Sequence, residues 1–496
     1  MSYRMVSQAL DHHTVPADFS KSLDSLGKAA GARRLAGESI AILGGGPTGL
    51  GAAHRLAEIG AADFQVFDEN SEAGGLASSF VDEHGFTWDI GGHVQFSHYP
   101  YFDQLMEDLL GGDWLEHERE SWVWMRDRFI PYPLQNNIHL LPRQEFEQCV
   151  RGLLDAMKRA GTPLRNFEDW IEASFGQGIA DIFLRPYNFK VWAHHPSMLS
   201  YQWVGERVAT VDLLRLLSNV LDGKEDRGWG PNNRFRFPRR GGTGHIWRTL
   251  ASRLPEGTFR PNRRCVHIET AKRAIHFEDG SRQNYDRLIS TIPLDVLLSV
   301  SDFKPLKPCA DQFRYSTVHV FGIGLKGEPP PHLKTKCWMY FPEDNCPFYR
   351  ATVFSNYSPN NVPDIRRFWS LMVEVSESPY KPADRAGLPE SVIRGLVAAK
   401  LIESPNQIVT VWIHSARHGY PTPFLGRDGI VEPILGELET LGIYSRGRFG
   451  GWKYEVSNQD HSLMQGVELV NRLAFGTPEM TYWYPTVANG IRGERK

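Results

Sequence analysis

The sequence predicts an α/β protein that combines a parallel βαβ unit, a helical segment and a mostly antiparallel β-sheet. Three observations support this fold class. A strand, a glycine-rich turn, a helix and a second strand follow one another from residue 40 onward, and apolar residues then recur at helical spacing between residues 144 and 222. Beyond residue 315, short β-branched and aromatic runs alternate with turn residues, which is typical of antiparallel sheets.

The composition is that of an ordinary globular protein. The 496 residues are 41% hydrophobic and 23% charged, with a formal net charge of -3 and no long run of lysine or arginine. Neither nucleic acid nor an anionic membrane is therefore expected as a partner. No apolar run reaches the roughly 18 residues of a membrane span and no secretory signal is visible, so we expect a cytoplasmic location. The five scattered cysteines contain no CxxC pair, which suits reduced thiols.

The βαβ unit carries a dinucleotide-binding turn. The strand predicted at residues 40–43 enters the pattern Gly-x-Gly-x-x-Gly, and the second strand, at residues 64–67, is followed by an acidic residue. This is the context of a Rossmann-like turn, in which glycines let the backbone approach a pyrophosphate and the carboxylate binds a ribose. The residues predicted to contact the dinucleotide are Gly44, Gly46, Pro47, Thr48, Gly49 and Asp68.

A second glycine-rich turn favours FAD over NAD as the tightly bound cofactor. "AGGLASS", residues 73–79, directly follows the second strand, as in a large class of flavoproteins. It adds Gly74, Gly75, Leu76 and Ser78 to the predicted cofactor site. Near the far end, "RGRFGGWKYEVSNQDHS" leads into a helix predicted to begin around His461, whose N-terminus would face the flavin or its pyrophosphate.

Several long motifs carry a family resemblance. "GGHVQFSHYPYFD", "YPLQNN", "GIADIFLRPYNFKVWA", "FRFPRRGGTGHIW", "YFPEDNCPFYRATVFSNYSP", "HGYPTP" and "RGRFGGWKYEVSNQDHS" occur in this order. Together they resemble the eukaryotic-type UDP-galactopyranose mutases over about residues 38 to 485. The resemblance implies an isomerase that interconverts UDP-galactopyranose and UDP-galactofuranose with no net redox change, and so a place in galactofuranose biosynthesis. It also implies FAD as the cofactor, active when reduced, and NADPH as the reductant.

The resemblance predicts a Rossmann-like FAD-binding domain in three pieces, residues 38–140, 225–312 and 433–496. A helical substrate and flap domain is expected at residues 141–224 and a mostly antiparallel sheet domain at residues 313–432. Residues 1–37 lack sustained apolar periodicity and are predicted to form a mobile N-terminal arm. The sequence contains no indication of the oligomeric state.

The resemblance also assigns roles to individual residues. Arg185 and Arg350 would grip the substrate diphosphate, because guanidinium forks match phosphate oxygens. His93 would lie beside the flavin as a third catalytic residue, and Gly91 and Gly92 would contact the cofactor. The expected substrate contacts are Tyr132, Gln135, Phe175, Asn188, Trp338, Tyr357, Tyr420, Tyr454 and Asn458. Arg448, Asn458 and Gln459 are expected at the FAD.

The implied mechanism needs little acid or base chemistry from the protein. Reduced flavin N5 would attack the anomeric carbon, UDP would depart, and the sugar would reclose as a furanose. In agreement, we find no GxSxG elbow, no paired carboxylates in a clear catalytic context and no metal-ligand cluster in the sequence, so no metal is predicted. Two mobile flaps are implied, one at residues 185–190 and one after "VGERVA".

Three alternatives remain open. A flavin-dependent amine or porphyrinogen oxidase would share the glycine turns but would present an apolar or aromatic cage instead of two arginines in diphosphate motifs. A mutase for a related nucleotide sugar, of deoxy- or amino-galactose type, would keep the same UDP-binding residues. Val211-Asp212, where the family tends to have Pro-Asn, puts the exact sugar in question. A non-catalytic nucleotide-sugar sensor would bind UDP without turnover.

Overall fold

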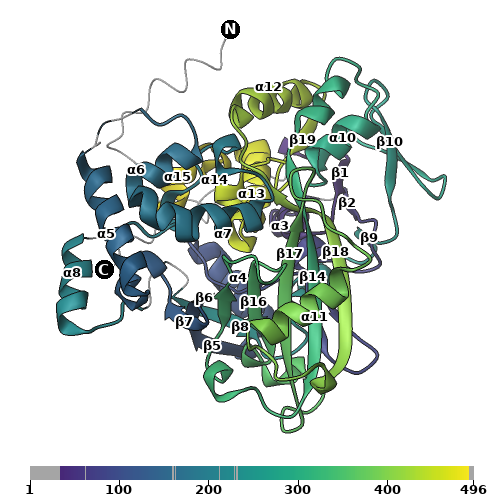
Figure 1. Cartoon of the computed structure of the whole chain (residues 1–496). Helices are drawn as coiled ribbons and strands as arrows, with labels where there is room; N and C mark the ends of the chain where they lie inside the picture. The colour runs from purple at the N-terminus through teal and green to yellow at the C-terminus, as the bar shows by residue number, and fades with distance from the viewer. Residues whose placement is uncertain are drawn as a thin grey trace.

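The computed structural model describes residues 34–490, apart from residues 62, 159–160, 162, 212, 228–229 and 231–232. The predicted N-terminal arm lies almost entirely outside the described residues, and so does Asp212. The predicted α/β fold class is confirmed (Figure 1). None of the helices in this described part is both long enough and apolar enough to cross a bilayer.

A five-stranded parallel sheet holds the first glycine turn. Its strands lie in the order β19-β13-β1-β2-β9, and every neighbouring pair is parallel. The strands are β1 Ile40–Leu43, β2 Phe64–Phe67, β9 Phe259–Arg260, β13 Arg287–Ser290 and β19 Ile443–Ser445. The strands predicted at residues 40–43 and 64–67 are thus confirmed. All four residues of β1 are buried, as expected for a central parallel strand.

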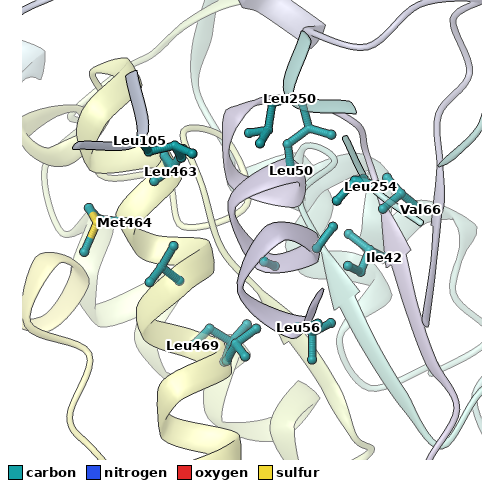
Figure 2. Packing of buried hydrophobic residues seen from close by; sticks show 14 of the residues in the cluster. Ile42, Leu50, Leu56, Val66, Leu105, Leu250, Leu254, Leu463, Met464 and Leu469 are labelled. Carbon is teal, nitrogen blue, oxygen red and sulfur yellow. The ribbon is translucent and has the colours of Figure 1, made fainter. Parts of the chain in front are cut away.

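Two helices pack against each other beside this turn. α3, Pro47–Glu58, starts directly after the turn, and α13, Gln459–Phe475, returns from the far end of the chain. Figure 2 shows α3 lying between α13 and the strands that carry Ile42 and Val66. α13 begins at Gln459, slightly earlier than the predicted start around His461.

The close approach of α3 and α13 requires glycine. A Cβ on Gly466 of α13 would lie 2.1 Å from the carbonyl oxygen of Thr48. A Cβ on Gly51 of α3 would lie 2.4 Å from the carbonyl oxygen of Leu463. The nearest atoms that a Cβ would meet belong to the backbone of the other helix, which cannot move aside as a flexible side chain can. These two glycines therefore set the distance between the helices.

The segment between residues 143 and 222 is mainly helical. Its helices are α5 Arg143–Lys158, α6 Phe167–Ile179, α7 Arg185–Trp192 and α8 Leu213–Asp222. A π-helical turn, Ala180–Leu184, joins α6 to α7. α6 is interrupted at Gly176, whose φ of 68° favours glycine and whose position against α5 leaves no room for a Cβ.

A seven-stranded sheet forms the third part, in the order β18-β14-β17-β16-β15-β6-β7. Its strands are β6 Ser121–Met125, β7 Arg128–Pro131, β14 Tyr315–Lys326, β15 Trp338–Tyr340, β16 Arg350–Val353, β17 Phe368–Glu377 and β18 Ile408–Pro421. All pairs are antiparallel except β15 with β6. Helix α11, Leu388–Ala398, covers one face (Figure 1).

Two boundaries of the structure differ from the predicted segments. β6 and β7 come from residues 121–131, which the sequence assigned to the FAD-binding part, because their pairing with β15 joins segments about 200 residues apart and leaves no local pattern. At the other limit, the predicted boundary between residues 432 and 433 falls inside helix α12, Arg427–Thr440.

Smaller elements complete the fold. Three sheets are formed by β3 Ser79–Val81 with β4 Thr87–Asp89, by β5 Trp114–Glu118 with β8 Arg234–Pro238, and by β10 Cys265–Glu269, β11 Ala274–Phe277 and β12 Arg282–Asn284. The remaining α-helices of the described chain are α4 Pro100–Leu110, α9 Gly244–Ser252, α10 Leu294–Val300, α14 Met480–Trp483 and α15 Pro485–Gly490.

Candidate functional site

A cavity of about 1520 Å³ lies where the three parts meet. The glycine turn after β1, the segment at residues 90–96, the seven-stranded sheet and the loop before α13 all contribute to its wall. Single small-molecule sites usually occupy roughly 300–1,000 Å³. This cavity therefore has room for a dinucleotide together with a second ligand.

One end of the cavity is made largely of backbone. Gly44, Gly46, Pro47 and Thr48 line it, and Gly46 caps α3 without a side-chain hydrogen bond, so the first amides of the helix can bind an anion. Gly49 is not at the wall; a Cβ there would lie 1.9 Å from the Gly44 carbonyl oxygen. The turn is so tight that only glycine fits at residue 49.

Asp68 ties the two strands of the βαβ unit together. Its Oδ2 accepts the Gly45 amide at 2.6 Å, and its Oδ1 accepts the Asn70 amide at 2.8 Å. Asp68 also lines the cavity. The carboxylate thus helps to hold the glycine turn in shape, and its contact with a ribose stays a prediction.

The second glycine turn lies against the first. Gly75, Leu76 and Ser78 line the cavity, whereas Gly74, with a φ of 135°, supports the turn from outside the wall. A Cβ on Gly75 would lie 3.3 Å from the Cα of Gly46. The two glycine turns lie beside a helix N-terminus that no side chain caps. Together they form a cradle that fits the pyrophosphate of FAD.

His93 follows Gly91 and Gly92 in the chain, and all three residues line the cavity. Burial lowers the pKa of His93 to about 4, so the imidazole is neutral near pH 7. Its Nδ1 is buried and accepts or donates no hydrogen bond within the described residues. The Gly92 amide donates to Glu374 Oε1 at 3.0 Å, which connects this loop to the seven-stranded sheet.

Arg350 lines the cavity and is held by a buried carboxylate. Its Nε and Nη2 donate to Glu374 Oε1 at 2.9 Å and 2.7 Å, and the Tyr349 hydroxyl donates to Glu374 Oε2 at 2.6 Å. Burial opposes the charge on Arg350, but the carboxylate outweighs it and raises the arginine pKa. Burial likewise opposes the charge on Glu374, and Arg350 lowers the pKa of that carboxyl. Both groups therefore stay charged.

Aromatic side chains form much of the remaining wall. Tyr132, Trp338, Tyr420 and Tyr454, all predicted from the sequence, line the cavity. Tyr340, which was not predicted, joins them and accepts a hydrogen bond from Trp338 Nε1 at 2.6 Å. Burial raises the pKa of the Tyr420 hydroxyl, so it acts as a neutral hydrogen-bonding group.

The predicted cofactor residues of the C-terminal segment also reach the wall. Arg448, Asn458 and Gln459 line the cavity. Arg448 donates to Ser457 Oγ at 3.0 Å and to the Gly419 carbonyl at 3.1 Å, and its guanidinium lies 5.0 Å from the ring centre of Tyr420.

Arg185 does not reach the cavity in this conformation. Its Nε donates to Glu168 at 3.0 Å, and its two terminal nitrogens pair with Glu172 and Asp181. These carboxylates lie on α6 and the π-helical turn, close along the chain, so they meet the arginine charge locally. The expected joint grip of Arg185 and Arg350 on one anion is absent from this arrangement and stays a prediction.

Four other predicted substrate residues lie behind the wall. Gln135 donates to the Ala209 carbonyl at 2.6 Å, and Asn188 to the Leu184 carbonyl at 2.8 Å. Phe175 and Tyr357 are completely buried in apolar clusters. In this conformation these side chains support the fold, because their hydrogen bonds and apolar packing hold them away from the cavity.

Several charged wall residues were missed by sequence reasoning, and three of them lie at the aromatic end or beside the loop before α13. Glu374 is the single acidic residue inside the apolar strand pattern "FWSLMVEVS", a signal that could have marked it as a buried partner of a cation. Arg119 lies 5.8 Å and 5.6 Å from the ring centres of Tyr132 and Trp338. Arg207 belongs to the "VGERVA" segment. Arg119 and Arg207 carry no local signal, because only the fold places them at the cavity.

One buried cluster contains residue types that bind metals. Within the described residues, His98, Asp460 and His461 bring potential ligand atoms within 4.8 Å of one another. His98 Nδ1 and Asp460 Oδ2 form a hydrogen bond of 2.7 Å, and burial lowers the pKa of His461 to about 3. We read the cluster as a hydrogen-bonded support at the start of α13 and assign it no metal.

Comparison with known proteins agrees with this geometry. The sequence profile of the flavin containing amine oxidoreductases matches residues 47–363. Protoporphyrinogen oxidase 2, chloroplastic/mitochondrial, of Arabidopsis thaliana is 21% identical over 324 residues, which cover 55% of this chain and 60% of that protein. The chain thus spans about 60% of the length of this curated relative.

Among solved structures, a reduced UDP-galactopyranose mutase is 49% identical, with a TM-score of 0.89 and coverage of 91% of this chain and 97% of that chain. A putative protoporphyrinogen oxidase from Exiguobacterium sp. 255-15 is 14% identical, with a TM-score of 0.69 and coverage of 89% and 100%. The second likeness shows a shared fold alone.

Proposed function

Because the chain belongs to the flavin containing amine oxidoreductases and, among these, to the UDP-galactopyranose mutases, we propose that it interconverts UDP-galactopyranose and UDP-galactofuranose without net redox change. The observation that carries the proposal is the cavity. It joins a dinucleotide-binding end, made of two glycine turns, to an aromatic end that contains Arg350. A nucleotide sugar needs such a combination of an apolar wall and a cation for its diphosphate.

FAD is the cofactor that fits the backbone end of the cavity. The amides at the start of α3, the turn at Gly74 and Gly75, and the side chains of Asn458 and Gln459 would hold it. When bound in its reduced form, FAD would supply the nucleophile for the anomeric carbon. Following the resemblance, NADPH is proposed as the reductant.

Arg350 is proposed to stabilise the departing diphosphate. Glu374 engages its Nε and Nη2, which orients the guanidinium and leaves Nη1 to donate to a ligand. The tyrosines of the wall add neutral donors and exclude water, which strengthens a charge-assisted hydrogen bond. His93, neutral near pH 7, adds no charge beside the cofactor.

Arg185 is proposed to join the diphosphate only after α7 moves. In the described conformation it is balanced by Glu168, Glu172 and Asp181. The π-helical turn before α7 is an irregular connection at which such a movement is expected, since π-turns are often found at functional sites.

The test is an anaerobic assay of the purified holoprotein. The flavin is reduced with dithionite, UDP-galactofuranose is added, and UDP-galactopyranose is followed by chromatography. We expect conversion in the reduced sample and none in an oxidised control. Conversion by the oxidised protein would contradict a role for reduced flavin.

The same assay separates the alternatives. Binding of UDP without conversion, even after reduction, would overturn the proposed substrate and direct attention to other nucleotide sugars or to a sensor. Oxidation of amines or porphyrinogens by the oxidised protein, without any binding of UDP, would instead indicate an oxidase.

A further inference from the structure

We propose that Arg207 binds the diphosphate of the substrate directly, together with Arg350. This inference rests on the proposed function and assigns a ligand contact to a residue of the second flap. It starts from the balance of charge around the cavity. A diphosphate is attracted most by cations that no protein carboxylate already neutralises.

The two arginines predicted to grip the diphosphate are both balanced by carboxylates. Arg350 forms a bidentate pair with Glu374. Arg185 faces three carboxylates and lies away from the cavity. The resting charge of these two sites is therefore zero or negative, and neither alone supplies a net positive field for a dianionic group.

Arg207 is placed differently. It ends a short 3-10 turn, Gly205–Arg207, and its side chain lines the cavity. Its Nη2 donates to the Glu455 carbonyl at 2.8 Å, its Nη1 donates to Asn458 Oδ1 at 3.3 Å, and its guanidinium lies 4.9 Å from the ring centre of Tyr454. All of these partners are neutral, and within the described residues no carboxylate pairs with Arg207.

Arg448 lies on the same aromatic ring. Its guanidinium is 5.8 Å from the ring centre of Tyr454, and its hydrogen-bond partners Ser457 and Gly419 are also neutral. Burial lowers the pKa of Arg448, and the charge of Arg207 contributes to this lowering. Arg207 and Arg448 are both partly buried and lie close together, and neither cation is paired with a carboxylate among the described residues. Such an arrangement is costly unless a ligand supplies the negative charge.

The ligand chemistry that fits is a diphosphate. Guanidinium groups match phosphate oxygens, and the hydroxyls of Tyr420 and Tyr454 can donate to the same group. Two molecules carry a diphosphate, the nucleotide-sugar substrate and FAD. We assign Arg207 to the substrate, because Tyr420 and Tyr454 belong to the aromatic end of the wall and Arg207 comes from the helical part. Asn458, which accepts a hydrogen bond from Arg207, is expected to contact both ligands, so Arg207 lies on the substrate side of their border.

The experiment compares Arg207→Gln with the unchanged holoprotein. UDP binding is measured by calorimetry on the reduced protein, uridine serves as a ligand without a diphosphate, and bound FAD is measured from the absorbance spectrum. We expect UDP to bind roughly tenfold or more weakly, because a charge-assisted contact is lost, with uridine binding and FAD content unchanged. Arg207→Lys should recover part of the affinity.

A matched control is Arg234→Gln, which removes an exposed arginine that pairs with Glu118 on the surface. It should leave UDP binding unchanged. Unchanged UDP affinity in Arg207→Gln, or an equal loss for UDP and uridine, would overturn the proposal. Loss of FAD with normal UDP affinity in reconstituted protein would reassign Arg207 to the cofactor. If the unchanged protein binds no UDP, the proposed function itself fails and this inference fails with it.

Discussion

Arg350 illustrates how one buried ion pair prepares a ligand-binding group. The carboxylate of Glu374 meets the Arg350 guanidinium on one side, the Tyr349 hydroxyl on another and the Gly92 amide on a third. A carboxylate with this many donors is rigidly held, so the arginine it binds has a defined direction. The position of the Arg350 side chain is thus set by residues from other parts of the sequence, Glu374 and Gly92 among them.

The first prediction concerns removal of this arginine. In Arg350→Ala, we expect turnover to fall by about 100-fold or more, because the departing diphosphate would lose the oriented cation that is proposed to stabilise it. The holoprotein should also lose about 3 kcal/mol of unfolding free energy, since Glu374 is left buried without its counter-ion. Turnover and urea unfolding are the two measurements.

The double variant Arg350→Ala/Glu374→Gln is the control. It should regain most of the lost stability without regaining turnover. Normal turnover by the single variant would remove Arg350 from the mechanism, and failure of the double variant to regain stability would show that the unpaired carboxylate is not the cause.

At the scale of elements, the packing of α3 against α13 affects the proposed cofactor site. Gly466 of α13 meets the carbonyl of Thr48, and Thr48 lies in the cavity wall. Any separation of these helices therefore moves the amides that are proposed to bind the FAD pyrophosphate. The sequence predicts both helices, but their distance depends on Gly51 and Gly466, each of which meets backbone of the other helix only in the fold.

The second prediction follows from this contact. Gly466→Ala should lower FAD occupancy and destabilise the protein by about 2 kcal/mol or more, because the added methyl group overlaps a backbone carbonyl. Gly436→Ala in α12 is the control, since its Cβ would meet open space, and it should be neutral or slightly stabilising. Equal effects of the two substitutions, measured by flavin absorbance and thermal unfolding, would contradict the packing argument.

Helix α7 provides the third prediction. If Arg185 must leave its carboxylates to reach the diphosphate, Glu168→Gln/Asp181→Asn should bind UDP roughly threefold to fivefold more tightly, because partly exposed ion pairs contribute modestly. Calorimetry on the reduced protein measures the change. Adding Arg185→Ala to this variant should abolish the gain, and a gain that persists without Arg185 would disprove the explanation.

At the scale of the whole molecule, the cavity is assembled from segments spread between residues 43 and 462. The stability of the site is therefore tied to global folding. α13 is central to both, because its first turn reaches the cavity and its later turns pack against α14. Between them lies Glu468, whose Oε2 accepts the Thr481 amide at 2.8 Å.

The fourth prediction concerns pH. Burial raises the pKa of Glu468 to about 8, well above the value of about 4.3 for an exposed glutamate. The folded state thus retains a proton that the unfolded state releases, so this group's stabilisation is full below about pH 4 and is lost as pH rises through about 8. Glu468→Gln should flatten the decline in unfolding free energy between pH 5.5 and 8.5.

Urea unfolding at several pH values measures this effect. Glu390→Gln, at an exposed position of α11, is the control and should leave the pH dependence unchanged. Histidines such as His93 and His461 are neutral in the fold but titrate at about pH 6.5 in the unfolded chain, so they add a pH dependence of their own. This contribution is the same in variant and parent, so the difference between the two proteins isolates Glu468. An identical pH slope in both proteins would show that Glu468 is ionised in the fold.

The sequence by itself determined the local units of this protein. The order of strand, glycine turn, helix and strand predicts the backbone end of the cavity, because backbone contacts near a helix N-terminus depend on neighbours in the chain. The β-branched and aromatic runs separated by turn residues likewise predict the long strands of the antiparallel sheet. The motif resemblance indicated the family and several wall residues, including Tyr420, Tyr454 and Arg350, while their ligand contacts stay predictions.

Only the tertiary structure decided which strands pair at the edge of the sheet and which partners the charged side chains meet. It brought β6 and β7 to the seven-stranded sheet, placed Glu374 against Arg350, turned Arg185 toward local carboxylates and set Arg207 on the ring of Tyr454. Each of these depends on partners contributed by other elements. An isolated pattern of residue types specifies a side chain's chemistry, whereas its free or neutralised charge depends on what the folded chain places within a few ångströms.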